Sequence, residues 1–485
     1  MRHLVATGVV LALVGVVTGC ATDAPDKSFE RVQGVLNGRS ETLPEWPLEP
    51  EAEGAVQNRV NELLHQPLTS QTVTEIALLN NRRLRAAFAR VGIASADLVE
   101  AGLLENPSLT SAFGFPEGSP SITELDFGLT FNILRLLMTP ARKQIANLQL
   151  DSTIFDVADE VLKTRSHAQM AFYELQAAEH LTSVLKEIMS AAESSAEFAR
   201  KLHDAGNLSD LALANEQVLY EETLLAYGRS VADAASLRER LNVALSLWGD
   251  ETDWSIVDRL PEVPAREPDV ANIESLAVRQ RFDLAATAKE VESLYFALGL
   301  QRRWRYVLTA DAGFIASRDT DGQWVFGPLL SIEIPIFNQR QADIARLEAA
   351  LQGAESRLDA IAIETRADVR RLLDRLYALR YEAEQYKSRV LPLRQRVTAL
   401  TQEQYNFMLM DTFDLLAAKR AEIASYRDYL DTVREYWITR AELERAVGGQ
   451  LPFSDGADPL DVHPPASTGS HQSAKTEHNH TIGGD

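Results

Sequence analysis

The fold is decided by a stretch that the chain contains twice, at Phe127–Leu148 (FGLTFNILRLLMTPARKQIANL) and at Phe326–Leu347 (FGPLLSIEIPIFNQRQADIARL). At this offset of 199 positions six residues are identical, and each copy runs from an alternating β-type segment into a long helical segment. The helix expected before each β-segment repeats as well, with Leu84 returning one position out of step as Leu284. Self-similarity at a fixed period indicates a tandem duplication.

Both β-segments alternate apolar and polar residues with a period of two, as half-buried strands do. The apolar rows are Leu125, Phe127, Leu129, Phe131 and Ile133, and then Trp324, Phe326, Pro328, Leu330, Ile332 and Ile334. Val325 and Leu329 are exceptions on the otherwise polar side of the second segment. Upstream partners at 109–115 and 306–314 complete two predicted hairpins, whose length and pattern fit a transmembrane β-barrel.

Four strands are too few for such a barrel. Open sheet edges do not survive in lipid, and bacterial barrels begin at about eight strands. The sequence therefore predicts at least a dimer, and three copies would supply twelve strands.

Very long helices are expected between the hairpins. No proline or glycine occurs between Pro140 and about His203, which at 1.5 Å per residue is roughly 95 Å of helix. Ser209 is the expected cap of a returning helix that ends near Trp248. The second copy predicts an outgoing helix over 339–405, kinked at Pro392, and a return to about Val447.

The first residues have the form of a bacterial secretory signal: Met1-Arg2-His3, an apolar run, and then Val17-Thr18-Gly19-Cys20. The apolar run is too short to span a bilayer. The end of this segment resembles a lipobox, so we expect Cys20, the only cysteine, to be acylated. The alternative is an ordinary signal peptide that contains a cysteine. Ala21 is not the aspartate of the inner-membrane retention signal, which favours the outer membrane.

The chain is strongly acidic, with a net charge of -22. Such a charge disfavours nucleic acid as a partner and suits a cation pathway or solvated helix faces.

These expectations divide the chain into a signal peptide (1–19), an extended N-terminal segment (20–67), two repeats (68–260 and 261–449) and a disordered tail (450–485).

Over about 68–448 the chain resembles the TolC-like outer-membrane efflux proteins. The motifs that carry the resemblance are Asn80-Asn81-Arg82-Arg83-Leu84, Arg281-Phe282-Asp283-Leu284, Ile334-Pro335-Ile336-Phe337-Asn338, Ala205-Gly206-Asn207-Leu208-Ser209 and Asp414-Leu415-Leu416. The departures are Arg82 and Phe282, where the family often has proline, the lack of a glycine after Phe337, and Phe407 where the second helix tip usually has glycine.

The resemblance implies a mainly helical fold with membrane strands. Its expected form is a homotrimer whose twelve-stranded outer-membrane barrel continues into a periplasmic α-barrel. It also implies partners, namely a periplasmic adaptor protein and an inner-membrane pump. The expected function is a passive exit duct for small molecules or metal cations, with no enzymatic activity and no cofactor.

Two groups of residues are candidate sites. At the second helix tip, Asp411 and then Asp414 are candidates for the pore gate, because threefold symmetry would turn each aspartate into a ring of like charges. Arg394, Arg396 and Arg420 are possible basic partners, and the simpler alternative is that Asp411 caps the returning helix.

The second group is the tail, which holds His463, His471, His478 and His480. Neutral imidazoles bind borderline metals such as copper. The alternative is a solvated tail whose histidines are incidental. His167, His180 and His203 fall on expected helices and are interpreted as surface or interface residues.

Two other functions remain open. Within the duct class, a type I protein-secretion duct has the same sequence pattern. A coiled-coil lipoprotein that tethers the outer membrane is the alternative from another class, but such a tether has no need of strands with a lipid-facing row. No motif of a known enzyme class is present.

Overall fold

The computed structural model describes the chain over residues 25–39, 50–115, 123–257, 259–267, 272–318, 321–407, 409–410, 412–449 and 451. Cys20, Asp411 and the four tail histidines lie outside these residues.

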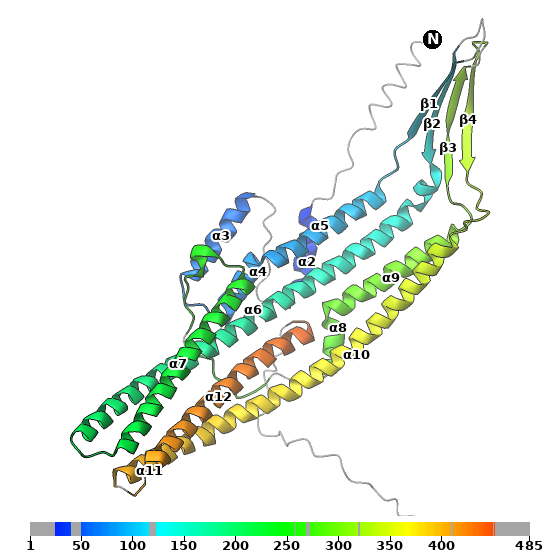
Figure 1. Ribbon diagram of the computed structural model, residues 1–485. Coiled ribbons are helices and arrows are strands. Elements are labelled where there is room, and N and C mark those ends of the chain that lie inside the picture. Colours follow the sequence, from blue (N-terminus) through cyan, green and yellow to red (C-terminus); the bar gives the residue numbers. More distant parts are fainter. Residues whose placement is uncertain are drawn as a thin grey trace, which may run out of the picture.

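Two repeats of one plan make up the molecule, which is long and narrow with strands at one end and helix tips at the other (Figure 1). The first repeat consists of α4 (Ser70–Asn80), α5 (Arg82–Gly102), β1 (Ser108–Gly114), β2 (Glu124–Asn132), α6 (Ile133–Asp204) and α7 (Asp210–Leu245). The second consists of α8 (Ile273–Gln280), α9 (Phe282–Arg303), β3 (Ala310–Arg318), β4 (Trp324–Ile332), α10 (Gln341–Gln385), the π turn η2 (Tyr386–Val390), α11 (Leu391–Asn406) and α12 (Thr412–Val447). The duplication is therefore structural as well as sequential.

The N-terminal segment differs from the expected extended chain over 20–67. It contains two helices, α2 (Pro25–Leu36) and α3 (Pro50–Leu64). Helix α2 forms because its apolar side has a partner: Val32 and Leu36 are completely buried against α5 and α6. Phe29 packs edge-on against Phe88, with 5.2 Å between the ring centroids.

The two hairpins form one antiparallel sheet in the order β1-β2-β3-β4. Strand β3 begins at Ala310, not at Tyr306 as the alternation predicted. The chain after α9 first makes a turn, in which the Val307 N–H donates to the Trp304 carbonyl oxygen. Tyr306 consequently lies in the connection below the sheet.

The outgoing helix of the first repeat is longer than predicted, because it begins at Ile133 and not after Pro140. The Asn132 side chain accepts a hydrogen bond from the Arg135 N–H and caps the helix directly at the end of β2. With 72 residues, α6 is about 108 Å long. Its return, α7, is capped by Ser209 as predicted.

The outgoing helix of the second repeat is interrupted near Pro392, as predicted, and the interruption has the form of a π turn. The Leu391 N–H donates to the Tyr386 carbonyl oxygen, five residues back. A π turn carries one extra residue and so displaces one hydrogen bond. Pro392 follows directly and has no backbone N–H that needs an acceptor in the preceding turn, so the regular α-helix continues from this point.

Each repeat has a corner between its two short helices at an equivalent position. Asn81 ends α4 and begins α5, where its side chain accepts from the Arg83 and Leu84 N–H groups. Arg281 holds the same place between α8 and α9, and it pairs with Asp283. The same backbone corner is therefore stabilised by different side chains.

Three buried apolar clusters lie along the middle of the molecule. One joins α3 and α4 to α6 and α7, the second joins α2 and α5 to α6, and the third joins α8 to α10 and α12. The strands and the helix tips extend beyond these clusters at either end. Among the described residues, no helix has both the length and the apolar composition needed to cross a bilayer.

Candidate functional site

One face of the sheet is largely apolar, with Ser111 and Arg318 as the polar side chains on it. In antiparallel strands, directly paired residues share a face, and Leu129 pairs with both Leu109 and Phe314. Phe127 pairs with Ala316, which pairs in turn with Phe326. The predicted apolar rows of the two repeats therefore point to the same side. Its large side chains are exposed, with relative exposures of 37% for Phe127 and 74% for Phe326.

The opposite face carries mostly small and polar side chains. They include Thr110, Asp126, Gly128, Thr130, Asp311, Ser317 and Ser331, with Val325 and Leu329 as the predicted exceptions and Ile315 as a further one. An apolar and a polar face on one sheet match a barrel wall between lipid and a water-filled interior.

Both outer strands of the sheet have an unpaired edge. Among the described residues, β1 pairs only with β2, and β4 pairs only with β3. Unpaired backbone N–H and C=O groups are a template for strand addition.

The first helix tip is a tight turn between α6 and α7. Gly206 has φ +76, a conformation that side chains with a Cβ rarely adopt. His203 Nε2 lies 2.7 Å from Asp210 Oδ1 and so joins the end of α6 to the start of α7. The hydrogen bond with Asp210 raises the pKa of the His203 imidazole above its ordinary value.

The second helix tip exposes apolar side chains. Phe407 and Leu409 are 68% and 76% exposed. Asp414 lies exposed in the first turn of α12, where the helix dipole favours an acidic side chain. Of the possible basic partners for a gate, Arg420 is paired with Glu222 on α7, so it joins the second tip to the first hairpin.

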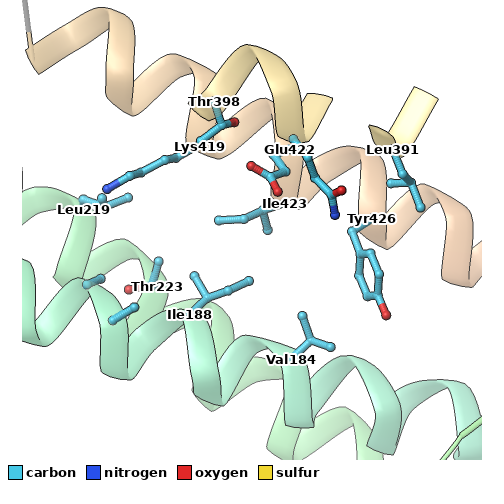
Figure 2. Close-up of a pocket in the computed structure, with 13 residues that line it drawn as sticks. Val184, Ile188, Leu219, Thr223, Leu391, Thr398, Lys419, Glu422, Ile423 and Tyr426 are labelled. Atoms are coloured by element: carbon cyan, nitrogen blue, oxygen red, sulfur yellow. The ribbon is translucent and has the colours of Figure 1, made fainter. Parts of the chain in front are cut away.

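A groove lies between the two helix pairs, close to the tips (Figure 2). Its volume is about 400 Å³, and all four helices contribute to it. The lining is mainly apolar, with Val184 and Ile188 from α6 opposite Ile423 and Tyr426 from α12. The two hairpins therefore do not pack tightly against each other at this level.

Comparison with known proteins depends on structure alone, because no family model and no curated protein sequence matches the chain. The Campylobacter jejuni CmeC outer membrane channel has a TM-score of 0.66 and 15% identity, over 88% of this chain and 93% of that one. The outer membrane protein VceC of Vibrio cholerae has a TM-score of 0.67 and 13% identity, over 84% and 100% of the two chains. The open state of the Neisseria gonorrhoeae MtrE outer membrane channel has a TM-score of 0.63 and 15% identity, over 80% and 91%.

The chain has the TolC-like outer-membrane channel fold. The resemblance found in the sequence motifs is thus confirmed at the level of the fold. Both tip motifs and both corner motifs lie at equivalent places in the two repeats of this TolC-like fold.

The predicted histidines on helices are where they were expected, on α6. His180 Nε2 lies 3.4 Å from the Tyr426 hydroxyl, next to the groove. Among the residues that the structure describes, no cluster of three or more His, Cys, Asp or Glu side chains is arranged to hold a metal ion.

Sequence reasoning missed two surfaces of the TolC-like fold. The groove escaped notice because it needs four helices that are distant in sequence. The second consists of two rows of exposed apolar residues. One lies on α7, at Leu211, Val218 and Leu225, and the other at Leu393 and Leu400 of α11 and at Phe407 directly after that helix. Their spacing of seven residues was a readable coiled-coil signal.

Proposed function

We propose that three copies of this chain form an outer-membrane channel, in which twelve strands close a β-barrel and the long helices form a periplasmic tube. The observation that carries the proposal is the largely apolar face of a sheet whose two edges are unpaired in the described part of the chain. Lipid requires every backbone group to be paired, and this is achieved only by closing the sheet with further strands. Two copies would give eight strands and three would give twelve; the TolC-like fold favours three.

The exposed sides of the helices favour the same contact between neighbouring copies. Helix α7 packs mainly on α6, and α11 packs mainly on α12, so their outer sides are left without a partner in one chain. The apolar rows with heptad spacing lie on α7 and along α11 to its C-terminal cap, Phe407. Contact between α7 of one copy and α11 of the next would bury both rows, and the same rotation would join β4 to β1. Such a head-to-tail contact makes a ring when the rotation closes.

The activity of this assembly would be passive transport. We propose an exit duct for small molecules or metal cations, which receives them through a periplasmic adaptor from an energised inner-membrane pump. A tethering lipoprotein is disfavoured, because it would leave the apolar sheet face without a use.

Single-channel recording tests the duct directly. Full-length protein reconstituted in planar bilayers should give discrete, long-lived conductance steps. A correctly folded oligomer that shows no conductance under any voltage or salt condition would contradict the proposal.

The gate proposal concerns Asp411, with Asp414 second. Asp411→Asn keeps much of the capping ability and removes the ring of charge. It should therefore raise the open probability or lower cation selectivity in the same recordings. Unchanged conductance and selectivity would leave Asp411 only as a helix cap.

Lipid anchoring at Cys20 and metal binding by the tail are separate proposals. Cys20→Ser should abolish acyl labelling while the strands still insert, and an unacylated wild-type protein would refute the anchor. Removal of residues 458–485 should lower copper binding measured by calorimetry. Equal copper affinity with and without the tail would exclude a role for its four histidines.

A further inference from the structure

The region just below the sheet has a charge opposite to that of the whole chain. We call it the basic collar and define it by residues 99–107, 133–146, 296–309 and 333–348, where helices and connections meet the strands. It contains eight basic and five acidic side chains, whereas the complete chain has 48 basic and 70 acidic ones. A local excess of positive charge in so acidic a protein calls for an anionic partner.

The connection between α9 and β3 alternates basic and aromatic residues: Arg302-Arg303-Trp304-Arg305-Tyr306. Tyr306 is 61% exposed, and the Arg305 guanidinium carbon lies 4.8 Å from the centre of its ring. Tyrosine and tryptophan are enriched at membrane–water interfaces because their rings are amphipathic. Long basic side chains bury their stems there and direct their charges towards the head groups.

An apolar shelf separates the sheet from the collar charges in the second repeat. The connection from β4 to α10 exposes Ile334, Ile336 and Phe337, and Phe337 is 90% exposed. In the second repeat the order from the sheet downwards, apart from Glu333, is thus apolar strands, apolar and aromatic side chains, and then basic side chains. This is the order of hydrocarbon, interface and head groups in a membrane leaflet.

Part of the positive charge is already balanced within the collar. Three ion pairs join Arg135 to Glu105, Arg302 to Glu348, and Arg346 to Asp343. Arg340 is used structurally, because its guanidinium donates to Gln301 and to the Leu308 carbonyl oxygen.

Four further basic side chains have no acidic partner among the residues that the structure describes: Arg142, Lys143, Arg303 and Arg305. Arg305 already lies over the Tyr306 ring, which leaves Arg142, Lys143 and Arg303. Lys143 and Arg303 are exposed, and Arg142 is partly exposed. Lys143 is ten residues from the start of α6, which places its backbone about 15 Å below the end of the strand. The long Lys143 side chain can extend from there towards the sheet, which brings its ammonium group closer to the head-group layer than its backbone.

We propose that the basic collar binds the anionic head groups of phospholipids in the leaflet that faces the helices, chiefly through Arg142, Lys143 and Arg303. This inference rests on the proposed function, since it places the sheet in a membrane. The bound lipids would fix the depth and tilt of the duct, and the anionic charge that they supply would replace the missing acidic partners. Phosphate diesters accept hydrogen bonds from both guanidinium and ammonium groups.

The test compares two full-length triple variants with the wild type. The collar variant is Arg142→Gln, Lys143→Gln and Arg303→Gln. The matched control is Arg366→Gln, Arg389→Gln and Arg427→Gln, which removes the same charge from exposed arginines far from the sheet. Each protein is incubated in detergent with equal amounts of phosphatidylethanolamine and phosphatidylglycerol, and native mass spectrometry measures the ratio of bound lipids.

The wild type and the control should retain phosphatidylglycerol preferentially. The collar variant should lose about fivefold of this preference per basic residue, the change that corresponds to about 1 kcal/mol. An unchanged lipid ratio in the collar variant would overturn the proposal. If that variant also had altered cation permeability in planar bilayers, its three side chains would be assigned to the lumen instead.

A different result would refute the proposed channel function. A protein that prefers phosphatidylglycerol but never forms a channel would refute the duct and leave the lipid site intact.

Discussion

The two repeats reach the same architecture with different continuity in their outgoing helices. In the first repeat α6 is unbroken for 72 residues and starts directly at the strand. In the second repeat an eight-residue connection precedes α10, and the π turn separates α10 from α11. The first copy therefore provides a rigid column from strand to tip, and the second provides two places where the local geometry can change. Duplication preserved the pairing of the elements, whereas the local chemistry of the junctions diverged.

The largest effect is expected on the sheet, where the two repeats should behave alike. Phe127→Arg and Phe326→Arg each place a charge on the apolar face, which the proposed channel turns towards lipid, at a cost of about 2 to 4 kcal/mol near the bilayer midplane. Asp126→Arg and Ser331→Arg place it on the polar face and should cost much less. The yield of oligomer inserted in vesicles measures the difference. Equal yields for both pairs would show that the faces are misassigned.

A smaller effect should separate two glycines of positive φ. At Gly448 (φ +88) a Cβ would lie 2.9 Å from the Gln280 backbone, whereas at Gly206 (φ +76) it would meet nothing within 4 Å. Gly448→Ala should therefore cost about 1 to 3 kcal/mol, and Gly206→Ala about 1 kcal/mol, the penalty of the left-handed backbone alone. Urea unfolding midpoints provide the measurement. A greater loss for Gly206→Ala would contradict the packing of α12 against α8.

The π turn should make the second outgoing helix locally weaker than the first. Loss of one regular hydrogen bond, about 1 kcal/mol, should speed amide exchange at Tyr386–Val390 about fivefold relative to residues 186–190 of α6. Pro392→Ala restores an N–H and should narrow the difference. Identical exchange in both segments would remove the distinction between the two helices.

The smallest effect concerns pH at the two tips. Because hydrogen bonding to Asp210 raises the pKa of His203, the stabilisation is present below the unfolded pKa, about 6.5, and is lost as pH rises through the folded value. The second tip has no histidine and should not respond in this range. An NMR titration should find the His203 pKa lowered in Asp210→Asn. An identical pKa in both proteins would exclude the pairing.

The sequence alone predicted what depends on local periodicity. Alternation located β2 and β4, Ser209 located the start of α7, and Pro392 located the interruption before α11. Prediction from the sequence was wrong where tertiary packing determines the structure. Helix α2 was not predicted, and it forms because Val32 and Leu36 are buried against α5 and α6. Tyr306 fits the alternation yet lies outside the strand, because the end of α9 makes a turn first. The groove and the basic collar depend on segments that only the fold brings together.

The central claim is that the sheet closes through contact of β4 with β1 of the next copy. The duplication predicts the register of this contact. Asp126 pairs with Ser317 between the repeats, Val325 corresponds to Asp126, and Ala112 corresponds to Ser317 because Leu109 faces Leu129 as Phe314 faces Pro328. Val325 should therefore lie opposite Ala112 of the neighbouring copy.

Disulfide trapping tests this register most directly. In a Cys20→Ser background, Val325→Cys combined with Ala112→Cys should give covalent trimers on a denaturing gel after mild oxidation. Val325→Cys combined with Ser111→Cys places the thiols on opposite faces and should not. Absence of cross-linked trimers in the first variant, or equal cross-linking in both, would contradict closure of the barrel by strand addition between copies.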